Sequence, residues 1–194
     1  LNDLGDLEGI GTLGFRGEAL ASIGSVAEVE VLTRPKGAAL GNLASAKYGR
    51  ILEPSRQGAP EGTSVTVRSL FANLPARRKF LRQAPAEARA VADWVTKLAL
   101  ARPDVRFDLR HGGREVFSCP PAADARARAA ALYGEETAAE LVEVEGSADG
   151  IRVRGWTSTP RLSFPNSVMQ HIFLGARSIQ DRTVSHAIRE AYHS

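Results

Sequence analysis

Alternating hydrophobic and polar residues mark several strands in the first part of the chain. Residues 26–32 place valines at alternate positions with glutamates between them, which predicts a half-buried strand. Residues 63–69 repeat this period, with Val65 and Val67 on a common face. Weaker strand signals cover residues 43–48 and 50–53.

Segments with helical spacing precede and follow these strands in the sequence. Residues 18–23 follow a run of glycines and are predicted to be helical, and Pro75 opens a short basic helix. A longer helix begins after Pro85 and ends near Pro103. Its apolar residues recur at i, i+3, i+4 and i+7, namely Val91, Trp94, Val95 and Leu98.

The pattern restarts after a hairpin signal over residues 105–117. The adjacent Pro120 and Pro121 predict a domain boundary, which divides the chain into residues 1–121 and 122–194. The second part combines a helix at 125–133 and a C-terminal helix with strands at 140–145, 151–157 and 168–174. We therefore expect an α+β protein in two units.

Composition narrows the class of protein. Of the 194 residues, 43% are hydrophobic and 24% are charged, which is typical of a folded globular protein. No apolar run approaches the roughly 18 residues of a membrane helix, so we expect no membrane partner. The single cysteine, Cys119, excludes an intramolecular disulfide and suits a reducing, cytoplasmic setting. The histidines lack metal-binding spacing, and because the first residue is Leu1 we expect a piece of a longer protein.

The glycine-rich run at residues 9–17 is the first candidate site. Glycines directly ahead of a helix leave backbone N–H groups without partners, and the helix dipole adds positive charge there. Such a place suits a phosphate, to which Arg16 could add a charged contact. The alternative is a plain helix entry in which the glycines only permit the turn and Glu18 satisfies the dipole.

A second candidate joins a strand, a turn and a basic helix over residues 62–82. The hydroxyl of Thr63 could bind a ligand or only its own turn. Five cations and no acid occupy residues 68–82, namely Arg68, Arg77, Arg78, Lys79 and Arg82. These cations indicate either a phosphate-binding surface or a solvated helix end.

Together these stretches resemble the MutL family of DNA mismatch repair proteins. The resemblance rests on Leu13–Ser22 and on a Gly-Thr-x-Val-x-Val-x-x-Leu-Phe-x-Asn-x-Pro-Ala-Arg-x-Lys-Phe-Leu motif that begins at Gly62. Residues 98–105, 154–156 and 181–192 are also similar to the family, so the resemblance covers nearly the whole chain.

The resemblance implies a fold and a nucleotide site. Residues 1–121 would be the C-terminal part of a GHKL (Bergerat) ATPase α/β sandwich, the ATP-binding fold shared with gyrase and histidine kinases. Residues 122–194 would be a ribosomal protein S5 domain 2-like domain, truncated at its C-terminal end. Thr63 corresponds to the threonine near the adenine. The ATP lid corresponds to Gly14, Phe15, Arg16, Gly17, Glu18, Ala19 and Leu20.

The resemblance also implies which parts of the site this chain lacks. The family's catalytic glutamate and the asparagine that binds Mg²⁺ lie on a helix upstream of Leu1, and its active-site lysine lies beyond Ser194. We therefore expect no catalytic residue within this chain, and neither tight ATP binding nor hydrolysis by the chain alone. The family's Phe-Val-Asn-Gly-Arg reads Phe173-Leu174-Gly175-Ala176-Arg177 here, which leaves the conformation of this turn open.

DNA is the expected macromolecular partner, bound through its backbone without regard to sequence. The family resemblance further implies a homodimer that forms on ATP binding, a mismatch-recognition partner of the MutS type, and a bacterial cytoplasmic protein that acts at the nucleoid. The alternatives are a non-enzymatic DNA-binding module and a gyrase-type ATPase subunit. The expected DNA contacts are Arg77, Arg78, Lys79, Arg82, Arg152, Arg154 and Arg177.

Overall fold

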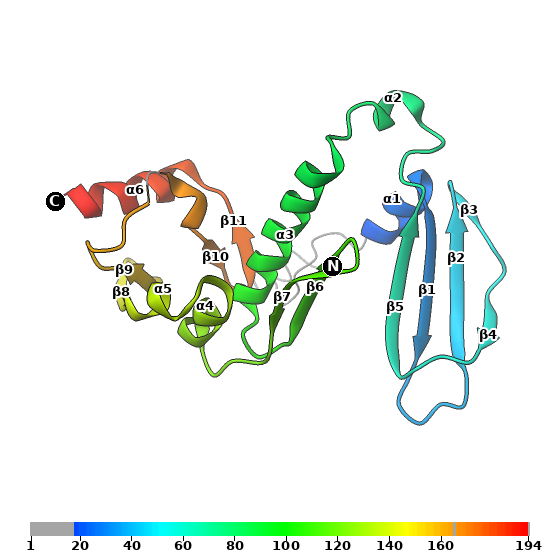
Figure 1. Cartoon of the computed structure of the whole chain (residues 1–194), viewed down its shortest axis with the longest axis horizontal. Coiled ribbons are helices and arrows are strands. Elements are labelled where there is room, and N and C mark those ends of the chain that lie inside the picture. The colour runs from blue at the N-terminus through cyan, green and yellow to red at the C-terminus, as the bar shows by residue number, and fades with distance from the viewer. Residues whose placement is uncertain (1–17, 165, 194) are drawn as a thin grey trace. The chain divides into compact units, whose positions relative to one another are not determined.

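The computed structural model describes residues 18–164 and 166–193. The described chain forms two compact units, and it passes from the first to the second between Gln83 and Ala84 (Figure 1). The first unit contains the sheet β1 to β5, and the second contains the longest helix and three hairpins. No helix within the described residues is both long enough and apolar enough to cross a bilayer.

The first unit is a helix followed by an antiparallel sheet. The strand order is β3-β2-β1-β5, and β4 pairs with β2 beside β3. The elements are α1 (Ala19–Val26), β1 (Glu28–Arg34), β2 (Gly41–Lys47), β3 (Arg50–Ile51), β4 (Ser55–Gln57), β5 (Gly62–Arg68) and the short α2 (Pro75–Arg78).

The two faces of this sheet differ in chemistry, as the alternation of valine and glutamate predicts. Val29 and Val31 of β1 lie opposite Val67 and Val65 of β5, so these valines share one face. Helix α1 packs on that face, where a Cβ added to Gly24 would lie 3.3 Å from the Cβ of Ala46. On the other face, Glu28 pairs with Lys47 and Glu30 pairs with Arg68.

The second unit packs helices against antiparallel hairpins. Its buried side chains include Ala99, Cys119, Arg128, Ala129 and Ala138. The elements are α3 (Ala84–Ala101), β6 (Phe107–His111), β7 (Arg114–Cys119), α4 (Ala125–Tyr133), α5 (Glu135–Ala139), β8 (Leu141–Ala148), β9 (Ile151–Ser158), the 3-10 helix η2 (Ser167–Met169), β10 (Ile172–Leu174), β11 (Arg177–Ile179) and α6 (Arg182–His193).

The structure confirms the α+β class but corrects the prediction of one strand over residues 168–174. The side chain of Asn166 accepts a hydrogen bond from the N–H of Val168 at 3.1 Å and caps η2, so the strand begins only at Ile172. The chain then turns at Gly175, whose φ of 60° suits the first position of a two-residue hairpin. Glycine therefore allows the Gly175-Ala176 sequence to make a tight turn between β10 and β11.

The chain on either side of Pro121 is joined by hydrogen bonds within the second unit. The N–H of Ala122 donates to the carbonyl of Pro103 at 2.8 Å, and the guanidinium of Arg128 donates to the same carbonyl at 2.8 Å. The boundary expected near residue 121 stays a prediction. The contacts show that residues 103–105 and 122–128 pack together in the described chain.

Candidate functional site

The start of α1 carries the described part of the predicted lid. Gly14, Phe15, Arg16 and Gly17 lie outside the described residues, whereas Glu18, Ala19 and Leu20 are exposed at the beginning of the helix. Glu18 occupies the N-cap position, and its side chain makes no capping hydrogen bond. Its negative charge lies at the positive end of the helix dipole, so the plain helix entry and the anion site both stay open as interpretations.

Thr63 lies on the face of the sheet that carries α1. Its position in β5 is opposite Thr33 of β1, and the two hydroxyl oxygens are 2.8 Å apart. Thr33 also donates to the carbonyl of Gly62 at 3.4 Å. The sequence suggested a bond to a ligand or to the local turn; the described partner is a threonine on the neighbouring strand, which fixes where the Thr63 hydroxyl lies.

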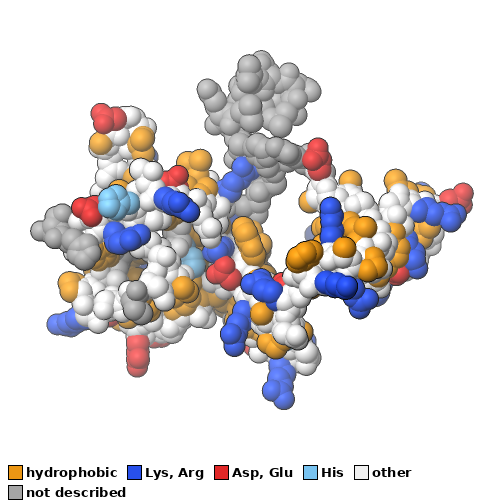
Figure 2. All heavy atoms as spheres, turned by 90° about the horizontal axis from the view of Figure 1, so that it is seen from above, with side chains coloured by type: hydrophobic (Ala, Val, Ile, Leu, Met, Phe, Trp, Pro, Cys, Tyr) orange, Lys and Arg blue, Asp and Glu red, His pale blue; other side chains and the backbone are white. Residues whose placement is uncertain are grey.

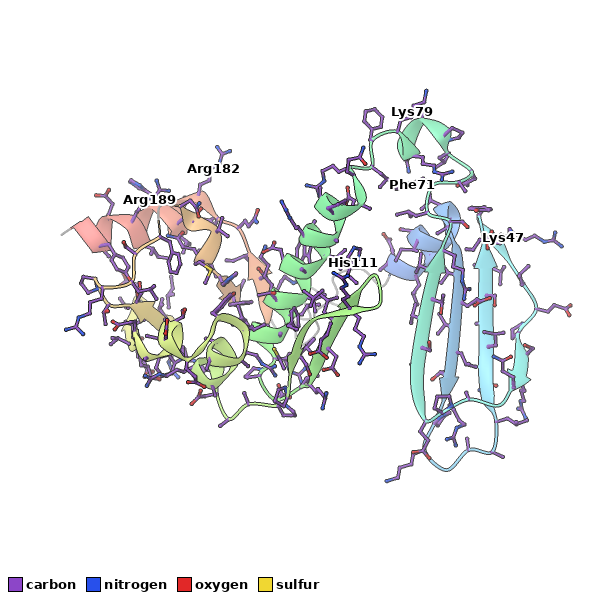
Figure 3. All side chains as sticks on the ribbon, viewed as in Figure 1. Lys47, Phe71, Lys79, His111, Arg182 and Arg189 are labelled. Carbon is purple, nitrogen blue, oxygen red and sulfur yellow. The ribbon has the colours of Figure 1, made fainter. Side chains whose placement is uncertain are left out.

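Helix α2 presents the predicted basic cluster at the surface. Arg77, Arg78 and Lys79 are exposed, and among the described residues none of them makes an ion pair. Lys79 extends outward at the end of α2 (Figure 3). Arg82 is also exposed but has an interaction partner in the chain. The three unpaired cations are available for an anionic partner.

The second unit distributes its predicted cations differently. Arg152 and Arg154 are exposed and two residues apart on β9, so they share one face of the hairpin, as expected. Arg177 follows the turn that the sequence left open: it is the first residue of β11, half-buried and with a partner in the chain.

Sequence reasoning missed two cations on α6. Arg182 and Arg189 are exposed and seven residues apart, and both are labelled on this helix in Figure 3. Seven residues are close to two helical turns, so this spacing places both cations on one side. The same spacing in the sequence could have identified them. Figure 2 shows Lys and Arg side chains interspersed with apolar side chains on the face that it presents.

A half-buried polar cluster lies inside the second unit. The Tyr133 hydroxyl and the Nε2 atom of His171 are 2.8 Å apart, and the two rings stack. Burial raises the pKa of Tyr133 to about 12. Burial, together with the charge of Lys97, lowers the pKa of His171, while Asp93 opposes that shift. No group of acidic, histidine or cysteine side chains among the described residues could hold a metal ion.

Comparison with known proteins identifies the class and then the family. A sequence profile described as "DNA mismatch repair protein, C-terminal domain" matches residues 129–194. The MutL proteins of Methanoculleus marisnigri and Symbiobacterium thermophilum are 43% and 41% identical over 99% and 96% of this chain. The chain spans 33% and 29% of their lengths, about a third of each.

Solved structures agree with these sequence matches. The Aquifex aeolicus MutL ATPase domain complexed with ADP has a TM-score of 0.74 and 30% identity; the match covers 97% of this chain and 70% of that domain. The N-terminal domain of a DNA repair protein shares the fold, with a TM-score of 0.77 and 23% identity. The fold and sequence are thus those of a DNA mismatch repair protein. The chain belongs to the MutL family.

Proposed function

We propose that this chain forms part of the ATP-binding and DNA-binding region of a mismatch repair ATPase. The observation that carries the proposal is the position of α1 and Thr63 on one face of an antiparallel sheet in a chain similar to an ATPase domain complexed with ADP. The first unit would belong to a GHKL sandwich. The second domain, residues 122–194, would be S5 domain 2-like, and the mismatch repair profile matches residues 129–194 within it.

Each part of the nucleotide would be held by a different part of the first unit. Backbone N–H groups of residues 14–20 would bind the phosphates, because helix N-termini favour anions. Thr63 would lie near the adenine, with its hydroxyl positioned by Thr33. The family resemblance places the asparagine that binds Mg²⁺ and the glutamate that activates water upstream of Leu1, so both would come from that segment of the parent protein.

The exposed cations would bind the DNA backbone. Phosphate contacts do not read sequence, so matched and mismatched duplexes would bind alike. The parent protein would dimerise when ATP orders the lid, act with a mismatch-recognition protein of the MutS type, and couple recognition to strand removal. This work would take place in the cytoplasm, at the nucleoid. The proposed contacts are the exposed Arg77, Arg78, Lys79, Arg82, Arg152 and Arg154, together with the half-buried Arg177.

Titration calorimetry of the full-length protein with a non-hydrolysable ATP analogue tests the proposal. Gly17→Val should weaken binding at least tenfold, about 1.4 kcal/mol, because a side chain there would obstruct close approach to the phosphates. Gly58→Val is the matched control, since an added Cβ at Gly58 meets no atom within 4 Å. If the parent protein binds DNA but not the analogue, that result favours the alternative function, a non-enzymatic DNA-binding module that uses the exposed cations.

A further inference from the structure

The C-terminal end of α1 is held by groups outside the helix. The last carbonyl groups of any helix lack partners within it. The turn between β2 and β3 supplies two N–H donors: Gly49 donates to the carbonyl of Gly24 at 2.8 Å, and Tyr48 donates to that of Ala27 at 3.1 Å.

The segment between β5 and α2 supplies two more donors. The N–H of Phe71 donates to the carbonyl of Val26 at 2.8 Å. The side-chain amide of Asn73 donates to the carbonyl of Ser25 at 3.2 Å. Carbonyls from four successive residues, 24–27, are therefore bonded to the rest of the first unit. Figure 3 labels Phe71 in this segment, next to α2.

The backbone of both donor segments adopts conformations that side chains disfavour. Tyr48, Ser69 and Phe71 have φ values of 48°, 56° and 60°, in the left-handed region. Among the described residues, Asp149 is the one other non-glycine residue with positive φ. Residues persist in such conformations only where the surrounding structure holds them. The hold on the end of α1 is thus a specific feature of this unit.

We propose that Asn73 is a positioning residue for nucleotide binding. It is the side-chain donor of this set, and it belongs to the Leu-Phe-x-Asn part of the family motif without contacting the predicted site. A helix of eight residues is roughly 12 Å long and marginal on its own, so its position depends on tertiary contacts. By holding Ser25, Asn73 fixes the helix whose other end carries the last residues of the predicted lid. The inference rests on the proposed nucleotide site.

The test measures nucleotide affinity and the order of α1 together in the full-length protein. Asn73→Asp keeps the size of the side chain but replaces the donor with an acceptor facing a carbonyl. We expect the dissociation constant of a non-hydrolysable ATP analogue to rise about threefold to tenfold, the worth of one hydrogen bond. Hydrogen exchange in residues 19–27 should accelerate by a similar factor.

Two further variants separate positioning from general damage. Asn73→Gln retains an amide donor and should recover much of the affinity. Asn166→Asp makes the same chemical change where the side chain accepts a bond, from Val168 N–H, and should leave both measurements unchanged. Unaltered affinity in Asn73→Asp, or lost affinity with unaltered exchange in α1, overturns the inference. A parent protein that binds no analogue overturns the proposed function itself, and the inference with it.

Discussion

Both units carry ion pairs at the surface, but among the described residues only the second unit buries a charged side chain completely. In the first unit, charged side chains pair across strands at the surface, as Glu28 does with Lys47 and Glu30 with Arg68. The second unit buries polar groups: Arg128 is 0% exposed, and its Nη2 atom donates to the carbonyls of Pro103 and Val105 at 2.8 and 2.5 Å. Its Nε and Nη1 atoms have no hydrogen-bond partner within the described residues.

This difference indicates which side chains of each unit can be replaced without loss of stability. Exposed ion pairs contribute about 0–1 kcal/mol, so the charges of the first unit are replaceable and remain accessible to ligands. A buried polar group is costly to desolvate, and its partners lose their bonds when it is removed. Arg128 therefore constrains the second unit, whereas the cations of α2 are free to serve binding.

Replacing Arg128 should have the largest effect. Arg128→Ala leaves the Val105 carbonyl without its guanidinium donor, and the Pro103 carbonyl keeps only the N–H of Ala122. It also leaves a cavity beside Phe107, whose ring lies 5.8 Å from the guanidinium carbon. We expect the free energy of unfolding to fall by about 3 kcal/mol, measured by urea denaturation. Arg114→Ala, at an exposed arginine of β7 whose side chain makes no hydrogen bond or ion pair among the described residues, should cost less than about 1 kcal/mol.

Arg128→Met sharpens this comparison because it preserves volume while removing the donor. It should cost about 1–2 kcal/mol, because the carbonyls of Pro103 and Val105 both lose the guanidinium donor. If the methionine variant is as stable as the parent, the buried charge costs as much as its hydrogen bonds contribute, and Arg128 does not constrain the unit.

Removing the cations of α2 should have the next largest effect. Arg77→Ala, Arg78→Ala and Lys79→Ala combined should lower DNA affinity about tenfold or more and reduce the slope of log affinity against log salt by up to about 2.7. Fluorescence anisotropy of the full-length protein with matched and mismatched duplexes measures both. Arg68→Ala is the control, because Arg68 already pairs with Glu30 at 2.8 Å and should matter little. Equal losses in both variants would contradict the distinction between paired and available cations.

The sequence predicted the helices and strands better than it predicted which side chains would contact one another. Valine and glutamate alternation located β1, and the helix over residues 125–133 has the bounds of α4, because both signals are local. The Asn166 cap and the bond between Thr33 and Thr63 join groups whose geometry depends on how the chain folds. The burial of Arg128 was equally hidden, since Arg126, two residues away, is exposed on the same helix. The lid residues 14–17 remain a prediction.

Acid should produce the smallest effect, through the half-buried His171. Burial and Lys97 lower its pKa in the folded state below the usual 6.5, so the unfolded chain binds the proton more readily. Stability should therefore be complete above pH 6.5, fall as the pH drops through the interval down to the lowered pKa, and then level off. The ring is partly solvated, which keeps the loss of stability well below that of Arg128→Ala.

Urea denaturation from pH 7.5 to 5 measures this dependence of stability on pH. The slope should be the same in the parent and in His186→Gln, which changes an exposed histidine, and should be smaller in His171→Gln. If the slope persists in His171→Gln, groups other than His171 cause the acid sensitivity. Arg128 would then be the one buried polar group, of the two tested, that affects the stability of the second unit.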